Sequence, residues 1–286
     1  MNLIREIKKM KDYIKRIKGK RIIGLVPTMG YLHEGHLSLI RKAEEECDEV
    51  VVSIFVNPTQ FGPAEDYHTY PRDLERDKKL SSREGADVIF APSVEDIYPQ
   101  GCSTFVNIEG RLSSILEAAS RPGYFRGVAT VVAKFFNIVT PDYAYFGEKD
   151  YQQALIIKKM VRDLNMNVKV ITLPTVREKD GLAISSRNSY FNEKEREVAT
   201  ILYKSLKKAK EWILGGEKDS SQIILKIKKL IEKEPLAKID YIAIVNPTNM
   251  EEVRNIDGEV LIALAVKIDK VRLIDNMRVR GNRCQR

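Results

Sequence analysis

Five short apolar runs divide the first part of the chain, and segments of helical periodicity separate most of them. The runs span residues 22–26, 50–56, 87–90, 143–146 and 168–173, with helical patterns at residues 34–46, 73–84 and 152–164. Strand, helix and strand at this spacing predict parallel pairing through right-handed crossovers. A further helix over residues 127–139 leads into the fourth run. We therefore predict a doubly wound, Rossmann-like α/β sheet.

The pattern changes near residue 180. Residues 192–214 and 220–234 have helical periodicity, and Gly215 and Gly216 separate them. Strand-like runs follow at residues 239–245, 260–268 and 271–274. Helices followed by consecutive strands favour a smaller α+β domain with an antiparallel sheet. We place the boundary within residues 176–181 and predict domains over residues 1–178 and 179–286.

The composition is that of a folded, soluble, intracellular protein. Apolar residues make up 43% and charged residues 31%, and no apolar run approaches the roughly 20 residues of a membrane span. The basic N-terminus lacks the unbroken apolar stretch of a signal peptide. Its apolar residues recur at helical spacing and predict a surface amphipathic helix: Leu3, Ile4, Ile7, Met10, Ile14 and Ile17. The three cysteines, Cys47, Cys102 and Cys284, are far apart, which is consistent with a reducing cytoplasm.

The formal net charge of +8 permits binding of nucleic acid or of small anions such as ATP. The densest basic patches are residues 8–20 and a tail with Arg278, Arg280, Arg283 and Arg286. We interpret them as solvated helix faces and a frayed terminus. Aromatic residues are not interleaved with the basic ones as a stacking platform for single strands requires. We therefore expect neither a nucleic acid nor a membrane as partner.

The first strand runs into the segment PTMGYLHEGH, residues 27–36. A loop between the carboxyl end of a parallel strand and a helix N-terminus is where α/β sheets bind ligands, and helix N-termini favour phosphate. His33 and His36 share a helix face, where they can hydrogen-bond a phosphate and stabilise a leaving pyrophosphate. A zinc site and a structural turn are the alternatives. The metalloprotease motif, however, places its histidines four residues apart.

Four more segments carry polar groups where strands end or helices begin. Gln60, after the second strand, could orient a small hydroxy acid or cap its own loop. The segment RPGYFRG, residues 121–127, could bind an anion or form a turn with solvated arginines. In FGEKDYQQ, residues 146–153, Lys149 could follow a phosphate into its transition state. In residues 176–188 two serines and Arg187 suit a triphosphate or form an ordinary turn.

The segment PTMGYLHEGH resembles the H-x-G-H signature of the nucleotidylyl-transferase superfamily, and with PTMG in front it is similar to the pantoate–β-alanine ligase family. The resemblance extends from Gly24 to about Asn276. It implies a cytoplasmic, homodimeric enzyme that activates pantoate with ATP and Mg²⁺ as a pantoyl-adenylate. The acyl group then passes to β-alanine, releasing AMP. The smaller domain would act as a lid.

The resemblance also implies the roles of individual residues. The ATP-binding residues would be Pro27, Met29, Gly30, His33, Gly35, His36, Gly147, Glu148, Lys149, Asp150, Val176, Ile184, Ser185, Ser186 and Arg187. Catalysis would fall to His33, His36, Lys149 and Arg187. The substrate-binding residues would be Thr28, Met29, Gln60 and Gln153, and of these Gln60 and Gln153 would contact pantoate. The resemblance does not identify the ligands of Mg²⁺. Ala118 and Tyr124 replace the glycine and histidine usual in the family, so we carry over no role to these positions.

Three other functions remain open at this point. A nucleotidylyltransferase acting on another small substrate would stop after the first step. An RNA-binding protein could keep a synthetase-like fold, although the basic excess is small. A zinc hydrolase could be built on the two histidines.

Overall fold

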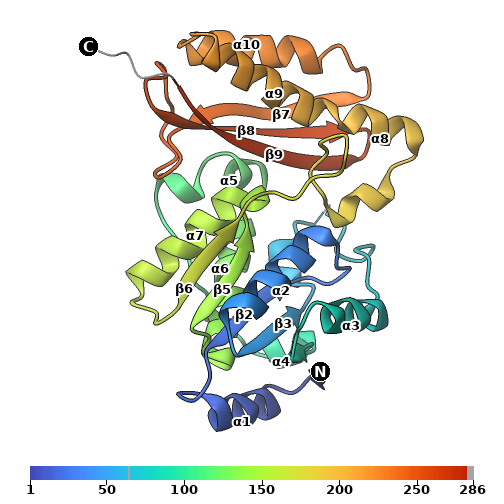
Figure 1. The fold of residues 1–286 in the computed structure, drawn as a ribbon, viewed down its shortest axis with the longest axis vertical. Coiled ribbons are helices and arrows are strands. Elements are labelled where there is room, and N and C mark those ends of the chain that lie inside the picture. Colours follow the sequence, from blue (N-terminus) through green and yellow to red (C-terminus); the bar gives the residue numbers. More distant parts are fainter. Residues whose placement is uncertain (64, 282–286) are drawn as a thin grey trace. The chain divides into compact units, whose positions relative to one another are not determined.

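The computed structural model describes residues 1–63 and 65–281. The chain divides into two compact units, Met1–Thr175 and Val176–Arg286, which are drawn in Figure 1. None of the described helices is long and apolar enough to cross a bilayer. Cys47 and Cys102 are free thiols, whereas Cys284, Arg283 and Arg286 lie outside the described residues.

The first unit is built on a parallel sheet of six strands in the order β1-β4-β3-β2-β5-β6. The strands are β1 (Asn2–Ile4), β2 (Ile23–Thr28), β3 (Glu49–Ile54), β4 (Val88–Phe90), β5 (Tyr143–Gly147) and β6 (Lys169–Leu173). From β2 the chain builds outward through β3 and β4, and from β5 it builds the opposite way. The strand order therefore reverses between β2 and β5, and the crevice outside their carboxyl ends is where such sheets bind ligands.

Helices cover both faces of this sheet. The longer ones are α1 (Ile7–Ile17), α2 (Glu34–Glu46), α3 (Leu74–Arg83), α6 (Tyr124–Val139) and α7 (Tyr151–Asp163), and the shorter ones are α4 (Val94–Ile97), α5 (Glu117–Ser120), η1 (Pro58–Gln60), η2 (Arg111–Ser113) and η3 (Glu148–Asp150). Leu25 and Val26 of β2 belong to different apolar clusters, because successive strand residues point to opposite faces. Helices α1, α6 and α7 pack into the first cluster and α2 into the second.

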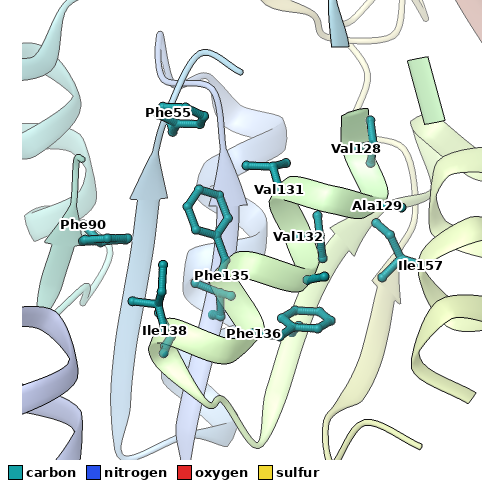
Figure 2. Packing of buried hydrophobic residues seen from close by; sticks show 14 of the residues in the cluster. Phe55, Phe90, Val128, Ala129, Val131, Val132, Phe135, Phe136, Ile138 and Ile157 are labelled. Carbon is teal, nitrogen blue, oxygen red and sulfur yellow. The ribbon is translucent and has the colours of Figure 1, made fainter. Parts of the chain in front are cut away.

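Helix α6 supplies much of the first cluster, as Figure 2 shows. Phe135 packs edge-on against both Phe55 and Phe90, with ring centroids 6.1 Å apart in each pair. Such edge-to-face pairs add to the stabilisation from buried area. The segment before this buried helix contacts the turn after β3, because Arg121 donates to the Gln60 carbonyl at 3.1 Å.

The second unit is an antiparallel sheet of three strands, β7 (Ala237–Val245), β8 (Glu259–Ile268) and β9 (Val271–Arg280), in sequence order. Its helices are η4 (Ser186–Tyr190), α8 (Glu193–Ala199), α9 (Ile201–Leu214) and α10 (Ser220–Ile231). Ile223, Ile227 and Ile231 of α10 recur every four residues and are buried in one apolar cluster with β8, as expected for one helix face. The predicted fold class, a doubly wound parallel sheet with a smaller α+β part, is confirmed.

The structure corrects the sequence prediction at three elements. Leu3 and Ile4 lie in strand β1 rather than in the N-terminal helix, because β4 offers an open edge: Ala91 N donates to Ile4 O at 2.9 Å. The predicted helix over residues 192–214 is split at Thr200, whose hydroxyl donates to Glu197 O at 2.6 Å and so competes with the helical ladder. Strand β9 continues to Arg280 because β8 pairs with it throughout.

Candidate active site

The loop after β2 is held by a buried carboxylate. Gly30 has a left-handed backbone (φ +81°), and an added Cβ would lie 3.0 Å from Asp77 Oδ2, so glycine suits this turn. The amides of Tyr31 and Leu32 each donate to one oxygen of Asp77 at 2.7 Å. Thr28 Oγ1 donates to Ser53 O and accepts from Gly30 N. These groups therefore have hydrogen-bond partners within the protein, and their hydrogen bonds fix the path of the loop into α2.

His33 and His36 lie together at the start of α2. Their rings stack with centroids 4.0 Å apart and planes 24° apart. His36 Nδ1 accepts from the backbone amide of His33 at 3.4 Å, which leaves the imidazole proton on Nε2. Gly35 lets the His33 ring lie over the first turn, since an added Cβ would be 3.1 Å from that ring. The amides of Glu34 and Gly35, in the first turn, have no carbonyl four residues earlier in the helix to bind.

Both imidazoles are neutral near pH 7. The pKa of His33 is lowered to about 2, mainly by burial and then by the neighbouring His36 and Lys149. Burial, followed by the charge of Lys149, lowers the pKa of His36 to about 4. Lys149 follows β5, in η3, so its charge reaches both rings from the other side of the switch point. Its Nζ lies 3.8 Å from Asp150 Oδ1. Two neutral donors and one cation thus gather where β2 and β5 end.

Gln60 is oriented by a chain of hydrogen bonds. Asn57 Nδ2 donates to Gly127 O at 3.1 Å, and a carbonyl can only accept, so the orientation of the Asn57 amide is fixed. The same Nδ2 donates to Gln60 Oε1 at 3.1 Å. Gln60 Nε2 then faces Met29 Sδ at 2.9 Å. Gly127 is required here, because a Cβ would lie 2.3 Å from Thr59 O.

Gln153 is held by a neighbouring tyrosine. Tyr124 OH donates to Gln153 Oε1 at 2.8 Å. The guanidinium of Arg121 lies over the Tyr124 ring, 3.7 Å from its centroid, and also donates to Glu65 and to the Gln60 carbonyl. Burial alone would lower the pKa of Arg121, but its hydrogen bonds to Glu65 and the nearby negative charge outweigh burial and raise that pKa. Arg121 therefore serves the frame of the site, where the sequence had left open a role in anion binding.

Five of the predicted ATP-binding residues lie in the second unit. Ile184 N donates to Val176 O at 3.1 Å, which closes residues 176–184 into a turn. Arg177 anchors this turn to β9 through two hydrogen bonds to Asp275, at 2.7 and 2.9 Å. Ser185 Oγ accepts from Arg187 N at 3.3 Å and opens η4. Val176, Ile184 and the Ser-Ser-Arg turn thus belong to one anchored loop.

The structure brings the predicted residues of the first unit together around the switch point. The histidines meet the charge of Lys149, Met29 contacts Gln60, and Arg121 links the Gln60 turn to the Tyr124–Gln153 pair. Gly147, Glu148 and Asp150 flank Lys149. Pro27 lies in β2 beside Thr28. That these residues meet the serines and Arg187 of the second unit stays a prediction.

Sequence reasoning missed the residues that support this site. Asp77 lies inside the helix predicted over residues 73–84, and its side chain is buried. Asn57 directly follows the second predicted strand, and it too is buried and orients Gln60. Tyr124 was noticed only as a departure from a family pattern. A buried carboxylate facing a glycine turn is a signal that appears only once the helix is placed in three dimensions. Within the described residues, no group of three or more His, Cys, Asp or Glu side chains is arranged to hold a metal ion.

The fold and these contacts define a class: a doubly wound α/β protein with a polar, partly cationic site at its topological switch point. The model of the pantoate-beta-alanine ligase family matches residues 2–278. The pantothenate synthetase of Carboxydothermus hydrogenoformans is 54% identical over 277 residues, covering 96% of this chain and 98% of that protein. The chain therefore belongs to the pantoate-beta-alanine ligase family and is an enzyme of that class.

Solved structures agree with this assignment. The crystal structure of pantothenate synthetase from Thermus thermophilus is similar with a TM-score of 0.93 and 45% identity, covering 97% of this chain and 99% of that one. The pantoate-beta-alanine ligase of Francisella tularensis is similar with a TM-score of 0.80 and 40% identity, covering 97% of each chain. That structure was solved in complex with beta-gamma ATP and beta-alanine.

Proposed function

We propose that this chain condenses pantoate with β-alanine by way of a pantoyl-adenylate. The pantoate carboxylate attacks the α-phosphorus of ATP, and the bond to the β-phosphate oxygen breaks, releasing pyrophosphate. The neutral amine of β-alanine then attacks the acyl carbon, and AMP leaves with the electrons of the acyl–oxygen bond. A carboxylate is a poor acyl donor, and adenylation provides the leaving group.

The observation that carries this proposal is the stacked pair of neutral imidazoles beside Lys149 at the switch point. His36, with its proton on Nε2, is a hydrogen-bond donor rather than a cation. A donor of this kind can stabilise negative charge growing on the phosphate chain as pyrophosphate leaves. Lys149 supplies the positive charge. With a pKa of about 4, His36 is a hydrogen-bond donor in this account and not a general acid.

The other side chains fit the same reaction. Gln60 and Gln153 would orient pantoate next to Met29, while Thr28, whose hydroxyl is committed, would contribute through its backbone. Ser185, Ser186 and Arg187 would bind the triphosphate from the loop of the second unit, which would act as a lid. No side chain becomes covalently modified, so catalysis consists of positioning and charge stabilisation.

Mg²⁺ fits this site as part of the substrate. It keeps several waters and binds through phosphate oxygens with few protein carboxylates, and the described residues provide no cluster of acidic side chains that would cage it. We therefore place it with ATP, where it would shield the phosphate charge. We also propose a cytoplasmic homodimer, which sedimentation of the purified enzyme would test.

The test is product analysis with each substrate omitted in turn. With ATP, pantoate and β-alanine, AMP, pyrophosphate and pantothenate should form in equal amounts. Without β-alanine, product should stop at about one equivalent per site. A nucleotidylyltransferase acting on another substrate would form the same amount of product with and without β-alanine, and that result would refute the ligase proposal.

A further inference from the structure

Tyr124 makes a defined contact with a proposed substrate-binding residue. It opens α6 directly after Gly123, whose φ of +83° suits glycine, and its hydroxyl donates to Gln153 Oε1 at 2.8 Å. Among the residues that the structure describes, 1–63 and 65–281, the Gln153 side chain makes this one hydrogen bond. The preceding residue, Gln152, is buried, and both ends of its amide are bound to backbone groups. Gln152 is therefore structural, whereas Gln153 is half-buried and, within the described part of the chain, only the oxygen of its amide is bound.

The Tyr124 ring is itself held in place. Arg121 lies over it at 3.7 Å from the centroid, and the same guanidinium donates to the Gln60 carbonyl at 3.1 Å. Two further hydrogen bonds to Glu65, at 2.7 and 2.6 Å, fix the arginine. Arg121 therefore ties the turn that carries Gln60 to the ring that holds Gln153, so the two glutamines share one frame.

In both glutamines the side-chain amide oxygen accepts a hydrogen bond from the protein. Asn57 occupies the oxygen of the Gln60 amide, and Tyr124 occupies the oxygen of the Gln153 amide. Gln153 then has its Nε2 group to offer a ligand, and Gln60 Nε2, which faces Met29 Sδ, has a second N–H to offer. An amide nitrogen is a donor only. A ligand that matches such a pair must present acceptor oxygens, as the hydroxyl and carboxylate oxygens of a hydroxy acid do.

We propose that Tyr124 is a positioning and specificity residue, which turns the Gln153 amide so that its nitrogen selects an acceptor oxygen of the hydroxy-acid substrate. This inference rests on the proposed function, in which that substrate is pantoate. It assigns a role to the position where the chain departs from the histidine usual in its family.

The test is Tyr124→Phe, which keeps the ring under Arg121 and removes only the hydroxyl. The KM for pantoate should rise about three- to tenfold, the effect of losing one neutral hydrogen bond. The KM values for ATP and β-alanine should stay within about twofold, since neither substrate depends on this bond. The matched control is Tyr13→Phe, which removes a hydroxyl bonded to Glu49 at the amino end of β3 and should leave the KM for pantoate unchanged.

A double-mutant cycle separates positioning from general loss of structure. In a Gln153→Ala background, Tyr124→Phe should change kcat/KM for pantoate by less than about twofold, because two residues that act through one contact are not additive. A full additional loss in that background would overturn the proposal, as would a wild-type KM for pantoate in the single variant. If the wild-type chain forms no AMP from ATP in the presence of pantoate and β-alanine, the proposed function fails and takes this inference with it. If only the Tyr124 variants behave as wild type, the proposed function stands.

Discussion

Replacing Asp77 with asparagine should loosen the loop that carries the histidines. The carboxylate accepts one amide on each oxygen, Tyr31 N on Oδ2 and Leu32 N on Oδ1, both at 2.7 Å. Asparagine has the same shape but a single acceptor oxygen. Its NH₂ group would therefore face one of the two amide donors, and that amide would lose its partner in a buried place.

The magnitude follows from the unsatisfied donor. A buried polar group left without a partner costs about 1–3 kcal/mol, so Asp77→Asn should lower the free energy of opening of this loop by about 2 kcal/mol. This corresponds to about 30-fold faster amide exchange, since about 1.4 kcal/mol is a factor of ten. Because the loop sets the position of the imidazoles, kcat/KM for ATP should fall about 100-fold, as small displacements of catalytic groups do.

Hydrogen-exchange mass spectrometry of peptides covering residues 28–36, together with steady-state kinetics, measures both effects. Asp73→Ala is the matched control in the same helix, because Asp73 caps α3 by accepting from Arg76 N at 3.0 Å. Its loss should cost about 1 kcal/mol of stability and leave exchange in the loop unchanged. Wild-type exchange and wild-type activity in Asp77→Asn would refute the view that this carboxylate holds the loop.

Three further predictions concern the same site. His36→Ala should slow pantoate-dependent pyrophosphate exchange about 100-fold and change ATP affinity far less; equal exchange rates would exclude the proposed role. The unfolding free energy should fall as the pH drops below about 6.5, by up to about 1.4 kcal/mol per pH unit for each imidazole. The sign follows because His33 and His36 have pKa values of about 2 and about 4 in the folded chain, so the unfolded chain binds more protons below about pH 6.5. Urea titrations at several pH values measure the unfolding free energy. If that free energy depended on pH as steeply in His36→Asn as in the wild type, this prediction would be contradicted. Gly127→Ala should destabilise the chain and raise the KM for pantoate, because its Cβ would lie 2.3 Å from Thr59 O, whereas Gly258→Ala meets no atom within 4 Å and should be neutral in both assays.

Most of the first unit's fold can be predicted from the sequence, because the strands of a parallel sheet buried on both faces are continuous apolar runs. Five of the six strands of the first unit could be found in this way, whereas β1 could not. Its three residues, Asn2–Ile4, continue the helical spacing of the segment after them, and only the open edge of β4 selects a strand. Tertiary pairing here overrides the local pattern.

Some residues of the candidate site can be identified from the sequence, and others cannot. Residues whose chemistry is visible in the sequence, such as His33, His36 and Lys149, could be identified because strand ends and helix starts mark where ligands bind. Residues that act on other residues could not. Asp77 looks like one more charged position on a surface helix, and its role depends on a loop that lies 45 residues earlier in the chain. Tyr124 departs from a family pattern, so the resemblance assigns it no role, and its bond to Gln153 depends on how α6 and α7 pack.

We propose that the switch point binds ATP so that a carboxylate oxygen of pantoate attacks the α-phosphorus. Pantoate labelled in its carboxylate with a heavy oxygen isotope tests this directly, by mass spectrometry of the AMP formed once β-alanine is added. Attack at the α-phosphorus transfers one labelled oxygen to AMP and leaves pyrophosphate unlabelled. Unlabelled AMP, or label in pyrophosphate or inorganic phosphate, would contradict the acyl-adenylate and the role we assign to this site.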